Sequence, residues 1–304
     1  MIKIGLRKLG LGILLFGMAV GCYAVSPVKA AETDVTIDGT NFQDSTFQEY
    51  VKSNFDTDGD GSLSESERNA VTEIVVNVND SSQTKITSLA GIEYFPNLTI
   101  LECENNSLIS LDVTKNVKLQ KLNCSYNQLT DLDISHNTQL TELSCSRNKL
   151  KELEVTENTQ LQRLRFHSNQ IKSINVSKNT ELLELSCGGN GLTTLDLSEN
   201  KNLTRVSCDS NQLTTLDLSD MPDLTTLDCG NNNLTSLDIS GDAELREVEC
   251  YKNSLTSLDV SNMPKLTTLR CYYNNLTDLD ISGDTALQKV ECYKNKLTSL
   301  DVSN

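Results

Sequence analysis

The stretch with the clearest chemistry is "DTDGDGSLSESE", which runs from residue 56 to residue 67. Its oxygen-bearing side chains follow the spacing of a twelve-residue calcium loop, with a glycine at the sixth position for the sharp turn. Six residues take the ligand places: Asp56, Asp58, Asp60, Ser62 (through its carbonyl), Ser64 (directly or through water) and Glu67 (through both oxygens). Because a hard cation prefers a cage of oxygens, this spacing predicts one structural calcium ion. The alternative is a solvated acidic turn.

Nine of the ten cysteines form a regular series: Cys103, Cys124, Cys145, Cys187, Cys208, Cys229, Cys250, Cys271 and Cys292. Each lies 21 residues from the next, except across one gap of 42 whose midpoint is Phe166. The number is odd, one place holds phenylalanine, and every place is an inward apolar position. Because free cysteine behaves as a small hydrophobe, we expect buried free thiols. Disulfides between neighbouring places and a metal site are the alternatives.

Other residue types keep the same period. We call the places of the cysteine series, including that of Phe166, the ladder positions. Leucine precedes each ladder position by five residues and usually by two, and apolar residues follow each ladder position by five and eight. Asparagine follows by three: Asn106, Asn127, Asn148, Asn169, Asn190, Asn211, Asn232, Asn253, Asn274 and Asn295. A fixed period of this size indicates a solenoid, in which each unit buries its apolar face on its neighbours. The asparagines are expected to satisfy backbone groups of the turn that leaves each strand.

The residues before each ladder position alternate with period two, as in a half-buried strand. A unit of 21 residues leaves little room for a helix, so we expect a mainly β solenoid with short turns. Residues 98–304 give ten units, the last incomplete. The pattern resembles the leucine-rich repeat family, LxxLxLxxNxL, and most closely its 21-residue bacterial subtype sometimes called IRREKO, with cysteine at the third apolar place. This resemblance implies a recognition scaffold, as in internalin-like adhesins.

Residues 1–30 predict a secretory signal peptide, with a basic start, an apolar run and small residues near Ala30. The segment "GLRKLGLGILLFG" also resembles the YSIRK-type signals of Gram-positive surface proteins. The apolar run is too short to cross a membrane, and no later segment is long or apolar enough to do so. Two processing routes remain open. Cleavage after Ala30 predicts a secreted or cell-surface protein, whereas "MAVGC" predicts a lipoprotein anchored through Cys22.

Residues 31–70 are expected to form a small helical domain around the predicted calcium loop. "DSTFQEYVKSNF" has apolar residues at helical spacing before the loop, and "ESERNAV" can begin a helix after it. This arrangement resembles an EF-hand. Together with the transition segment 71–97, it is expected to cap the solenoid, because an open end exposes unpaired strand groups. The last unit stops at "LTSLDVSN", which predicts either further sequence or a partner covering that end.

Residues that flank the ladder cysteines are expected to face outward, on the surface that leucine-rich repeat proteins use for ligands. Two groups are candidates for ligand binding: the basic Arg163, Arg165 and His167, and the aromatic Tyr251, Tyr272, Tyr273 and Tyr293 with Arg270. Tyrosines offer amphipathic area at low entropic cost and are favoured at binding surfaces. They could instead stabilise one another across strands, and a duplicated 42-residue unit could have copied them.

A further ladder is acidic, with these members: Asp112, Asp133, Glu154, Asn175, Asp196, Asp217, Asp238, Asp259, Asp280 and Asp301. Neighbouring like charges repel, so we expect compensating hydrogen bonds from turn amides or from the following Ser and Thr residues. Calcium along this ladder is the alternative. The formal net charge of −16 argues against nucleic acid or an anionic membrane as a partner.

The sequence does not predict an enzyme. It has only two histidines, and its serines and aspartates recur at ladder positions, so any catalytic triad chosen among them would be a coincidence. We expect a monomeric, exported recognition protein that binds proteins or glycans at a cell surface, with one structural calcium ion in its cap. Two alternatives stay open: a targeting module of a larger secreted enzyme, and a purely structural surface stalk.

Overall fold

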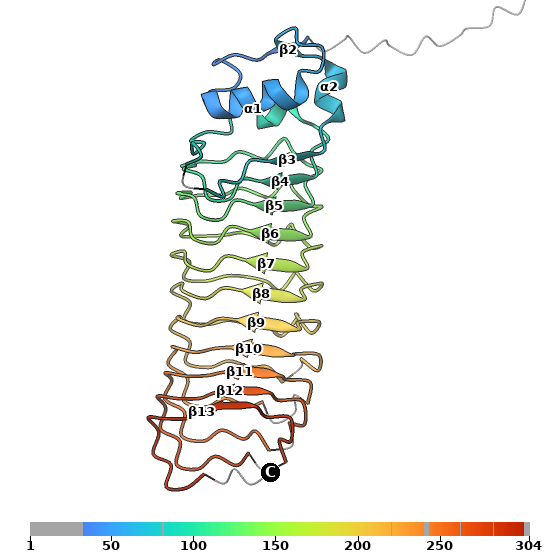
Figure 1. The fold of residues 1–304 in the computed structure, drawn as a ribbon. Helices are drawn as coiled ribbons and strands as arrows, with labels where there is room; N and C mark the ends of the chain where they lie inside the picture. The colour runs from blue at the N-terminus through green and yellow to red at the C-terminus, as the bar shows by residue number, and fades with distance from the viewer. Residues whose placement is uncertain are drawn as a thin grey trace, which may run out of the picture. The chain divides into compact units, whose positions relative to one another are not determined.

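The computed structural model describes residues 33–80, 82–219, 221–239, 243–261, 263–281 and 283–300. Residues from Thr33 onward form one compact unit (Figure 1). The predicted signal peptide, with Cys22, lies outside the described residues, as does Asp301 of the acidic ladder. Within the described ranges, no helix has the length and apolar character needed to cross a membrane.

The unit consists of a small helical cap followed by a stack of short strands. The cap contains β1 (Val35–Thr36), α1 (Ser45–Phe55), β2 (Ser62–Leu63) and α2 (Glu65–Ala70). The stack begins with β3 (Glu73–Val75), and a 3-10 helix, η1 (Ile92–Tyr94), precedes the next strand. The remaining strands are β4 (Ile100–Glu102), β5 (Lys121–Asn123), β6 (Glu142–Ser144), β7 (Arg163–Arg165), β8 (Glu184–Ser186), β9 (Arg205–Ser207), β10 (Thr226–Asp228), β11 (Glu247–Glu249), β12 (Thr268–Arg270) and β13 (Lys289–Glu291).

Strands β3 to β13 form one eleven-stranded parallel sheet in chain order (Figure 1). From β4 onward, equivalent residues 21 apart lie side by side, such as Leu122 of β5 and Leu143 of β6. These central side chains are buried, while the residues on either side of them are partly exposed. Stacking therefore buries one apolar side chain of each strand against the next turn. The predicted mainly β leucine-rich repeat solenoid with short turns is confirmed.

The sheet begins one strand earlier than the repeat pattern predicts. Strand β3 comes from the transition segment and starts 27 residues before β4 instead of 21, yet it pairs in register with β4. Its apolar Ile74 and Val76 are buried and take the places that leucine and cysteine hold in later units. The sequence signal was the alternation in "TEIVVNV", which the cysteine period does not include.

The cysteine ladder lies inside the solenoid. Its thiols are free and buried from Cys103 to Cys271, and Cys292 is partly buried. Phe166 takes the place between two cysteines and is fully buried. Burial raises the pKa of the thiols, to about 12 at Cys124, so they stay protonated and unreactive at neutral pH. The prediction of buried free thiols is confirmed.

The ladder asparagines fasten each turn to the one before it. The Asn127 amide donates to the carbonyl oxygens of Cys103 at 3.0 Å and Cys124 at 3.1 Å. Its Oδ1 accepts the N–H of Leu108 at 3.0 Å. The same pattern recurs one turn later at Asn148. As predicted, each side chain satisfies backbone groups that would otherwise be buried without partners.

The structure contains a second asparagine ladder that the sequence analysis did not predict. Each of its members lies thirteen residues after a place of the cysteine series. Its members are fully buried: Asn116, Asn137, Asn158, Asn179 and Asn200. The amide of Asn137 donates to the carbonyl oxygens of Val113 at 3.0 Å and Asn116 at 2.9 Å. The period was visible in the sequence, but the residue type changes to Met221 and Met263 in later turns.

The turn after each strand has a fixed backbone conformation. In every described unit from β4 to β13, the residue two places after the ladder position has a positive φ, from 51° at Lys252 to 62° at Gly189. Only Gly189 among them is a glycine. A residue with a side chain pays about 1–2 kcal/mol for this conformation. At turns such as those of Tyr126, Arg147 and Lys252, the stacked neighbours must therefore impose the conformation, since these residue types do not favour it.

Candidate functional site

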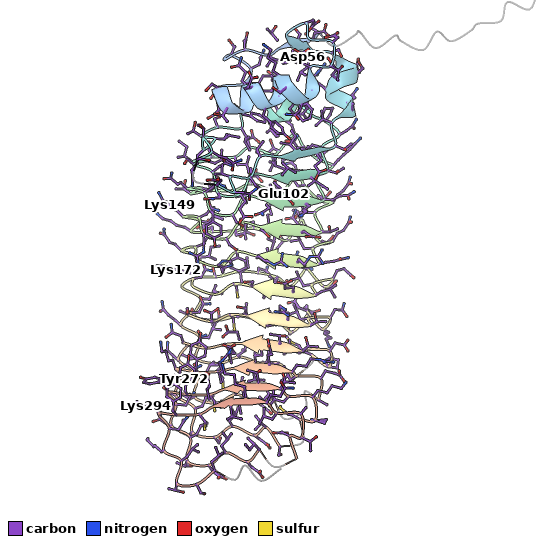
Figure 2. All side chains as sticks on the ribbon, viewed as in Figure 1. Asp56, Glu102, Lys149, Lys172, Tyr272 and Lys294 are labelled. Carbon is purple, nitrogen blue, oxygen red and sulfur yellow. The ribbon has the colours of Figure 1, made fainter. Side chains whose placement is uncertain are left out.

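The predicted calcium loop lies in the cap, between α1 and α2, where Figure 2 labels Asp56. Helix α1 begins after Asp44, whose carboxylate accepts the N–H groups of Thr46 and Phe47. Helix α2 begins after Ser64, which forms a capping box with Glu67. Both helix starts are thus satisfied by side chains, and the loop is held between two fixed ends.

The three aspartates of the loop converge. Carboxylate oxygens of Asp56, Asp58 and Asp60 lie within 4.8 Å of one another. Asp56 also accepts the N–H groups of Gly59 at 2.9 Å and Gly61 at 3.1 Å. Gly61 has a φ of 84°, the left-handed turn that the sixth loop position requires. The described part of the chain holds no other trio of His, Cys, Asp or Glu side chains that converges in this way.

Glu67 makes different contacts from the three aspartates. One of its oxygens accepts the N–H and hydroxyl of Thr57, at 2.6 and 2.7 Å. The other accepts the N–H and hydroxyl of Ser64, at 2.9 and 2.8 Å. These hydrogen bonds, that of the Thr57 hydroxyl above all, lower the pKa of Glu67 to about 2. Glu67 is therefore ionised but held apart from the aspartate group.

The two loop serines also have defined contacts. Ser62 lies in β2, and its N–H donates to the carboxylate of Asp60 at 2.7 Å. The next residue, Leu63, is fully buried and pairs with Val35 of β1. The Ser64 side chain caps α2. The loop is thus anchored by a buried side chain and by a short antiparallel strand pair.

The cap is tied to the first turns of the solenoid. The second oxygen of Asp44 accepts the N–H and hydroxyl of Thr87, both at 2.8 Å. The Tyr50 hydroxyl on α1 accepts the N–H of Val75 on β3 at 3.3 Å. Aromatic rings of the cap and of the segment after η1 also meet, with Phe55 and Phe95 centroids 5.4 Å apart. The edge strand β3 is therefore contacted by the cap.

The predicted basic group on the outer surface is neutralised by the adjacent strands. Arg163 forms an ion pair with Glu142 of β6. Arg165 donates two hydrogen bonds to Glu184 of β8, at 2.9 and 2.7 Å. His167 is partly buried, and this burial lowers its pKa, so its ring is neutral at pH 7. The group is therefore not a patch of uncompensated positive charge.

The predicted aromatic group forms a continuous stack. The rings of Tyr251 and Tyr272 lie 4.9 Å apart at 8°, and those of Tyr272 and Tyr293 lie 4.7 Å apart at 6°. Tyr273 stands edge-on to Tyr272 and Tyr293. Stacked and edge-on rings attract one another, so the tyrosines do pack on one another, as the alternative to ligand binding anticipated. Tyr273 and Tyr293 still expose 48% and 54% of their surface.

The start of the stack involves residues that the sequence reasoning did not single out. A Cβ at Gly230 would lie 2.5 Å from the Tyr251 ring, so glycine is required for the ring to lie over the preceding turn. Burial raises the pKa of Asp228 to about 7. Burial, and then the carboxylates of Asp228 and Asp209, raise the pKa of the Tyr251 hydroxyl. Arg270, the other predicted member, contacts carboxylates on both neighbouring strands.

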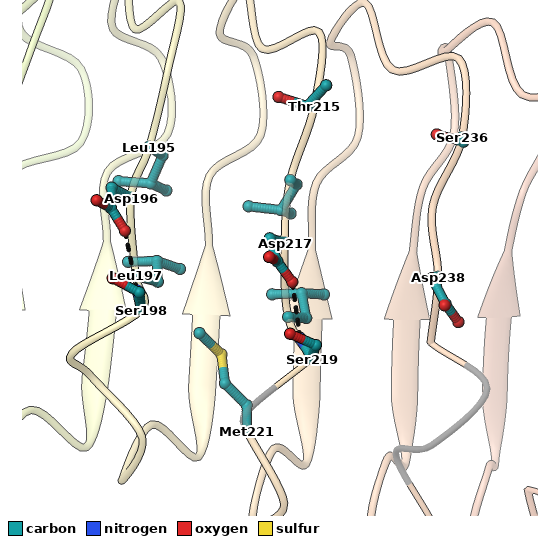
Figure 3. Close-up of a pocket in the computed structure, with 12 residues that line it drawn as sticks. Leu195, Asp196, Leu197, Ser198, Thr215, Asp217, Ser219, Met221, Ser236 and Asp238 are labelled. Atoms are coloured by element: carbon teal, nitrogen blue, oxygen red, sulfur yellow. Dashed lines mark hydrogen bonds between the residues drawn. The ribbon is translucent and has the colours of Figure 1, made fainter.

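The acidic ladder borders a shallow groove of about 440 Å³, shown in Figure 3. The Asp196 carboxylate accepts the N–H of Ser198, and that of Asp217 accepts the N–H of Ser219, both at 3.0 Å. These backbone hydrogen bonds, followed by those of the serine hydroxyls, lower the pKa of both aspartates. The predicted compensation by turn groups is confirmed. No three carboxylates among the described ladder members converge as a metal cluster would.

Parallel strands in register at a 21-residue period, with leucine, cysteine and asparagine ladders inside, define a leucine-rich repeat protein. A family model described as "Leucine Rich repeats (2 copies)" matches residues 117–157 and 201–241. Among solved structures, the functional domain of InlJ from Listeria monocytogenes, which includes a cysteine ladder, is 35% identical with a TM-score of 0.75. The chain thus has a leucine-rich repeat fold and is similar to the InlJ domain.

Two further structures support the fold. A leucine-rich repeat protein of Leptospira interrogans is 28% identical, with a TM-score of 0.66 over 74% of this chain. The internalin InlF of Listeria monocytogenes is 21% identical, with a TM-score of 0.64 over 89% of this chain and 95% of its own. The match to InlJ covers 90% of this chain but 64% of the InlJ domain, and this chain spans 62% of the Leptospira protein. A comparison with curated proteins finds no match.

Proposed function

We propose that the protein is an exported, monomeric recognition protein that binds a protein or glycan ligand at a cell surface through the outer side of its strands. One observation carries this proposal. Inward residue types repeat from turn to turn, whereas outward types vary and include four tyrosines on the turns that follow β11 to β13. A scaffold needs only the inward pattern, so the outward cluster is the part free to select a ligand. The similarity to a functional domain of InlJ supports the same reading.

The tyrosines provide the test. Replacing Tyr251, Tyr272, Tyr273 and Tyr293 with serine is expected to weaken binding to bacterial or host cell surfaces by at least about tenfold, because buried tyrosines often dominate an interface. Binding would be measured by flow cytometry with labelled protein, and folding by circular dichroism. A quadruple phenylalanine variant keeps the stack and separates lost hydroxyls from lost packing.

The matched control for this test changes the acidic ladder instead. Asp196→Asn with Asp217→Asn alters two exposed carboxylates of the groove in Figure 3 and should leave surface binding unchanged. If the serine variant stays folded and binds as the wild type does, the outer surface is not the binding site. The structural stalk, or the targeting of a catalytic domain through another face, would then be favoured.

We further propose that the cap holds one structural calcium ion. The donor set fits a hard cation, because Asp56, Asp58 and Asp60 bring carboxylate oxygens together. The Ser62 carbonyl and the Ser64 hydroxyl are the next donors in the loop. Glu67 would complete the set only by releasing the hydrogen bonds of Thr57 and Ser64. The ion would neutralise the aspartates and fix the loop between α1 and α2.

Removing this site should loosen the cap. Asp56→Ala combined with Glu67→Ala is expected to lower the melting temperature by about 5–10 °C, through the lost ion and the lost Glu67 hydrogen bonds. The first repeats should also become sensitive to protease. Differential scanning calorimetry and limited proteolysis, each with calcium and with chelator, would measure both effects.

Two further variants make the calcium test specific. Asp56→Asn preserves size and should abolish only the part of the stability that depends on calcium. Glu49→Gln, on the exposed side of α1, removes a carboxylate outside the loop and should behave as the wild type. If a chelator changes neither the melting temperature nor the protease pattern of the wild type, the cap holds no calcium.

A further inference from the structure

Two lysines beside the tyrosine stack lack the carboxylate partners found elsewhere on the strands. Lys252 and Lys294 are exposed. Each lies two residues after a ladder cysteine, Cys250 or Cys292, on the turns that follow β11 and β13. In the described ranges, neither forms an ion pair, whereas Arg163 and Arg165 are both paired with glutamates. Tyr273 holds the same place on the turn between the two lysines. Two free ammonium groups therefore flank an exposed ring.

The lysines and tyrosines share one surface. Lys252, Tyr273 and Lys294 have φ values of 51°, 56° and 58°, so the three turns present these side chains in the same way. Each is preceded by one ring of the stack. Figure 2 shows Tyr272 and Lys294 along the same edge of the solenoid. We call these six residues the tyrosine–lysine block: Tyr251, Lys252, Tyr272, Tyr273, Tyr293 and Lys294.

The stacking decides which part of the rings a ligand can reach. Because Tyr251, Tyr272 and Tyr293 cover one another's faces at 4.7–4.9 Å, they offer mainly edges and hydroxyls. The edge of an aromatic ring carries partial positive charge, and the phenol hydroxyl donates a hydrogen bond. Ring edges, hydroxyls and ammonium groups all favour a ligand rich in oxygen and negative charge.

Two of the carboxylates next to the block, those of Glu249 and Glu291, are compensated by cations. Glu249 pairs with Arg270. Glu291 pairs with Lys289 at 2.9 Å and lies 3.4 Å from Arg270. An anion at Lys294 would therefore meet paired carboxylates, despite the acidic charge of the chain as a whole.

We propose that the tyrosine–lysine block binds an acidic polysaccharide, with its carboxylates at Lys252 and Lys294 and its hydroxyls at the tyrosine row. This inference rests on the proposed surface-recognition function and gives its ligand a chemical class. A stable protein interface needs roughly 800 Å² and 20–30 residues from each partner, far more than six residues supply. A short stretch of polysaccharide needs no such area.

The spacing of the block also favours a polysaccharide over an acidic peptide. Side chains on one face of an extended peptide recur about every 6.6 Å, whereas the rings recur every 4.7–4.9 Å. A hexose in an extended chain advances by about one turn of this solenoid. Successive sugars can therefore meet successive tyrosines, with acidic groups two turns apart at the lysines.

Calorimetric titration of the full chain with an oligogalacturonate tests the proposal. The wild type should bind the oligomer, and added salt should weaken the binding. Lys252→Gln with Lys294→Gln should weaken it by at least about tenfold. The matched control, Lys149→Gln with Lys172→Gln, changes two lysines along the same edge in Figure 2 and should bind as the wild type does. Tyr251→Phe, Tyr272→Phe and Tyr293→Phe together should weaken binding without disturbing the stack.

Three results would overturn the proposal. The first is a fully methyl-esterified oligomer that binds as tightly as the acid, the second is poly-glutamate that binds as tightly as the oligomer, and the third is a control variant that loses as much affinity as the test variant. If the wild-type protein binds cell surfaces but does not bind the oligomer, this ligand class is refuted and the proposed function is retained. Protein that binds neither would refute both.

Discussion

Asn148→Ala is expected to lower the free energy of unfolding by about 3–5 kcal/mol. The side chain donates to the carbonyl oxygens of Cys124 and Cys145, both at 3.0 Å, and accepts the N–H of Leu129 at 2.9 Å. Alanine leaves the buried Leu129 N–H without a partner, which costs about 1–3 kcal/mol, and removes two further hydrogen bonds worth about 0.5–1.5 kcal/mol each. The two carbonyl oxygens each keep one asparagine donor, Asn127 at Cys124 and Asn169 at Cys145. Because solenoid turns are stabilised mainly by their neighbours, the loss should spread to the turns on both sides.

Urea unfolding followed by circular dichroism would measure the effect of Asn148→Ala, and hydrogen exchange would locate it. Asn175→Ala is the matched control, since Asn175 is exposed and accepts only the N–H of Ser177. That variant should lose about 1 kcal/mol or less. Equal losses in the free energy of unfolding at the two positions would mean that the ladder asparagines do not stabilise the contacts between turns.

Phe166→Ala is expected to cost a similar amount, about 3–5 kcal/mol, because it opens a cavity where a fully buried ring stood. The more informative change is Phe166→Cys, which completes the cysteine series. Neighbouring side chains have packed around the ring, so restoring the consensus residue should still destabilise the protein. Thermal and urea unfolding would give both values.

The comparison for Phe166 is Cys187→Ala, one turn further along, where the deleted group is much smaller. A smaller loss is expected there than for either change at Phe166. A Phe166→Cys variant as stable as the wild type would show that this turn relaxes freely, and that close packing does not fix the residue at that place.

The interior of the solenoid was predictable because one period governs it. Once Cys124 and Cys145 are recognised as equivalent, the register of β5 and β6 and the contacts of the ladder asparagines follow. Strand β3 escaped this reasoning because its unit is longer and Val76 takes the cysteine place. The 21-residue period therefore predicted which residues stack on one another, but it missed the turn that contains β3, which is longer.

The outer surface was less predictable, although a signal was present. Arg163 and Arg165 look like a basic patch along the chain, but their partners come from the turns before and after. Reading the sequence at intervals of 21 residues would have shown Glu142, Arg163 and Glu184 alternating in charge. Contacts between turns are local in space but distant in sequence, so a reading along the chain overlooks them.

The calcium loop shows a different limit, in which two motifs use the same residues. Ser64 and Glu67 are the last predicted ligands, and they also form the capping box of α2. The sequence cannot decide which role prevails, because the same serine and glutamate spacing serves both. The structure places Glu67 in the capping role and brings only Asp56, Asp58 and Asp60 together.

The unpaired sulfurs bear on how such a chain can mature. A scaffold closed by sulfur–sulfur bonds depends on an oxidant and on enzymes that correct wrong pairings. Here the thiols from Cys103 to Cys271 act only as small apolar side chains. Folding therefore needs no redox partner, and a reducing agent should leave the folded protein intact.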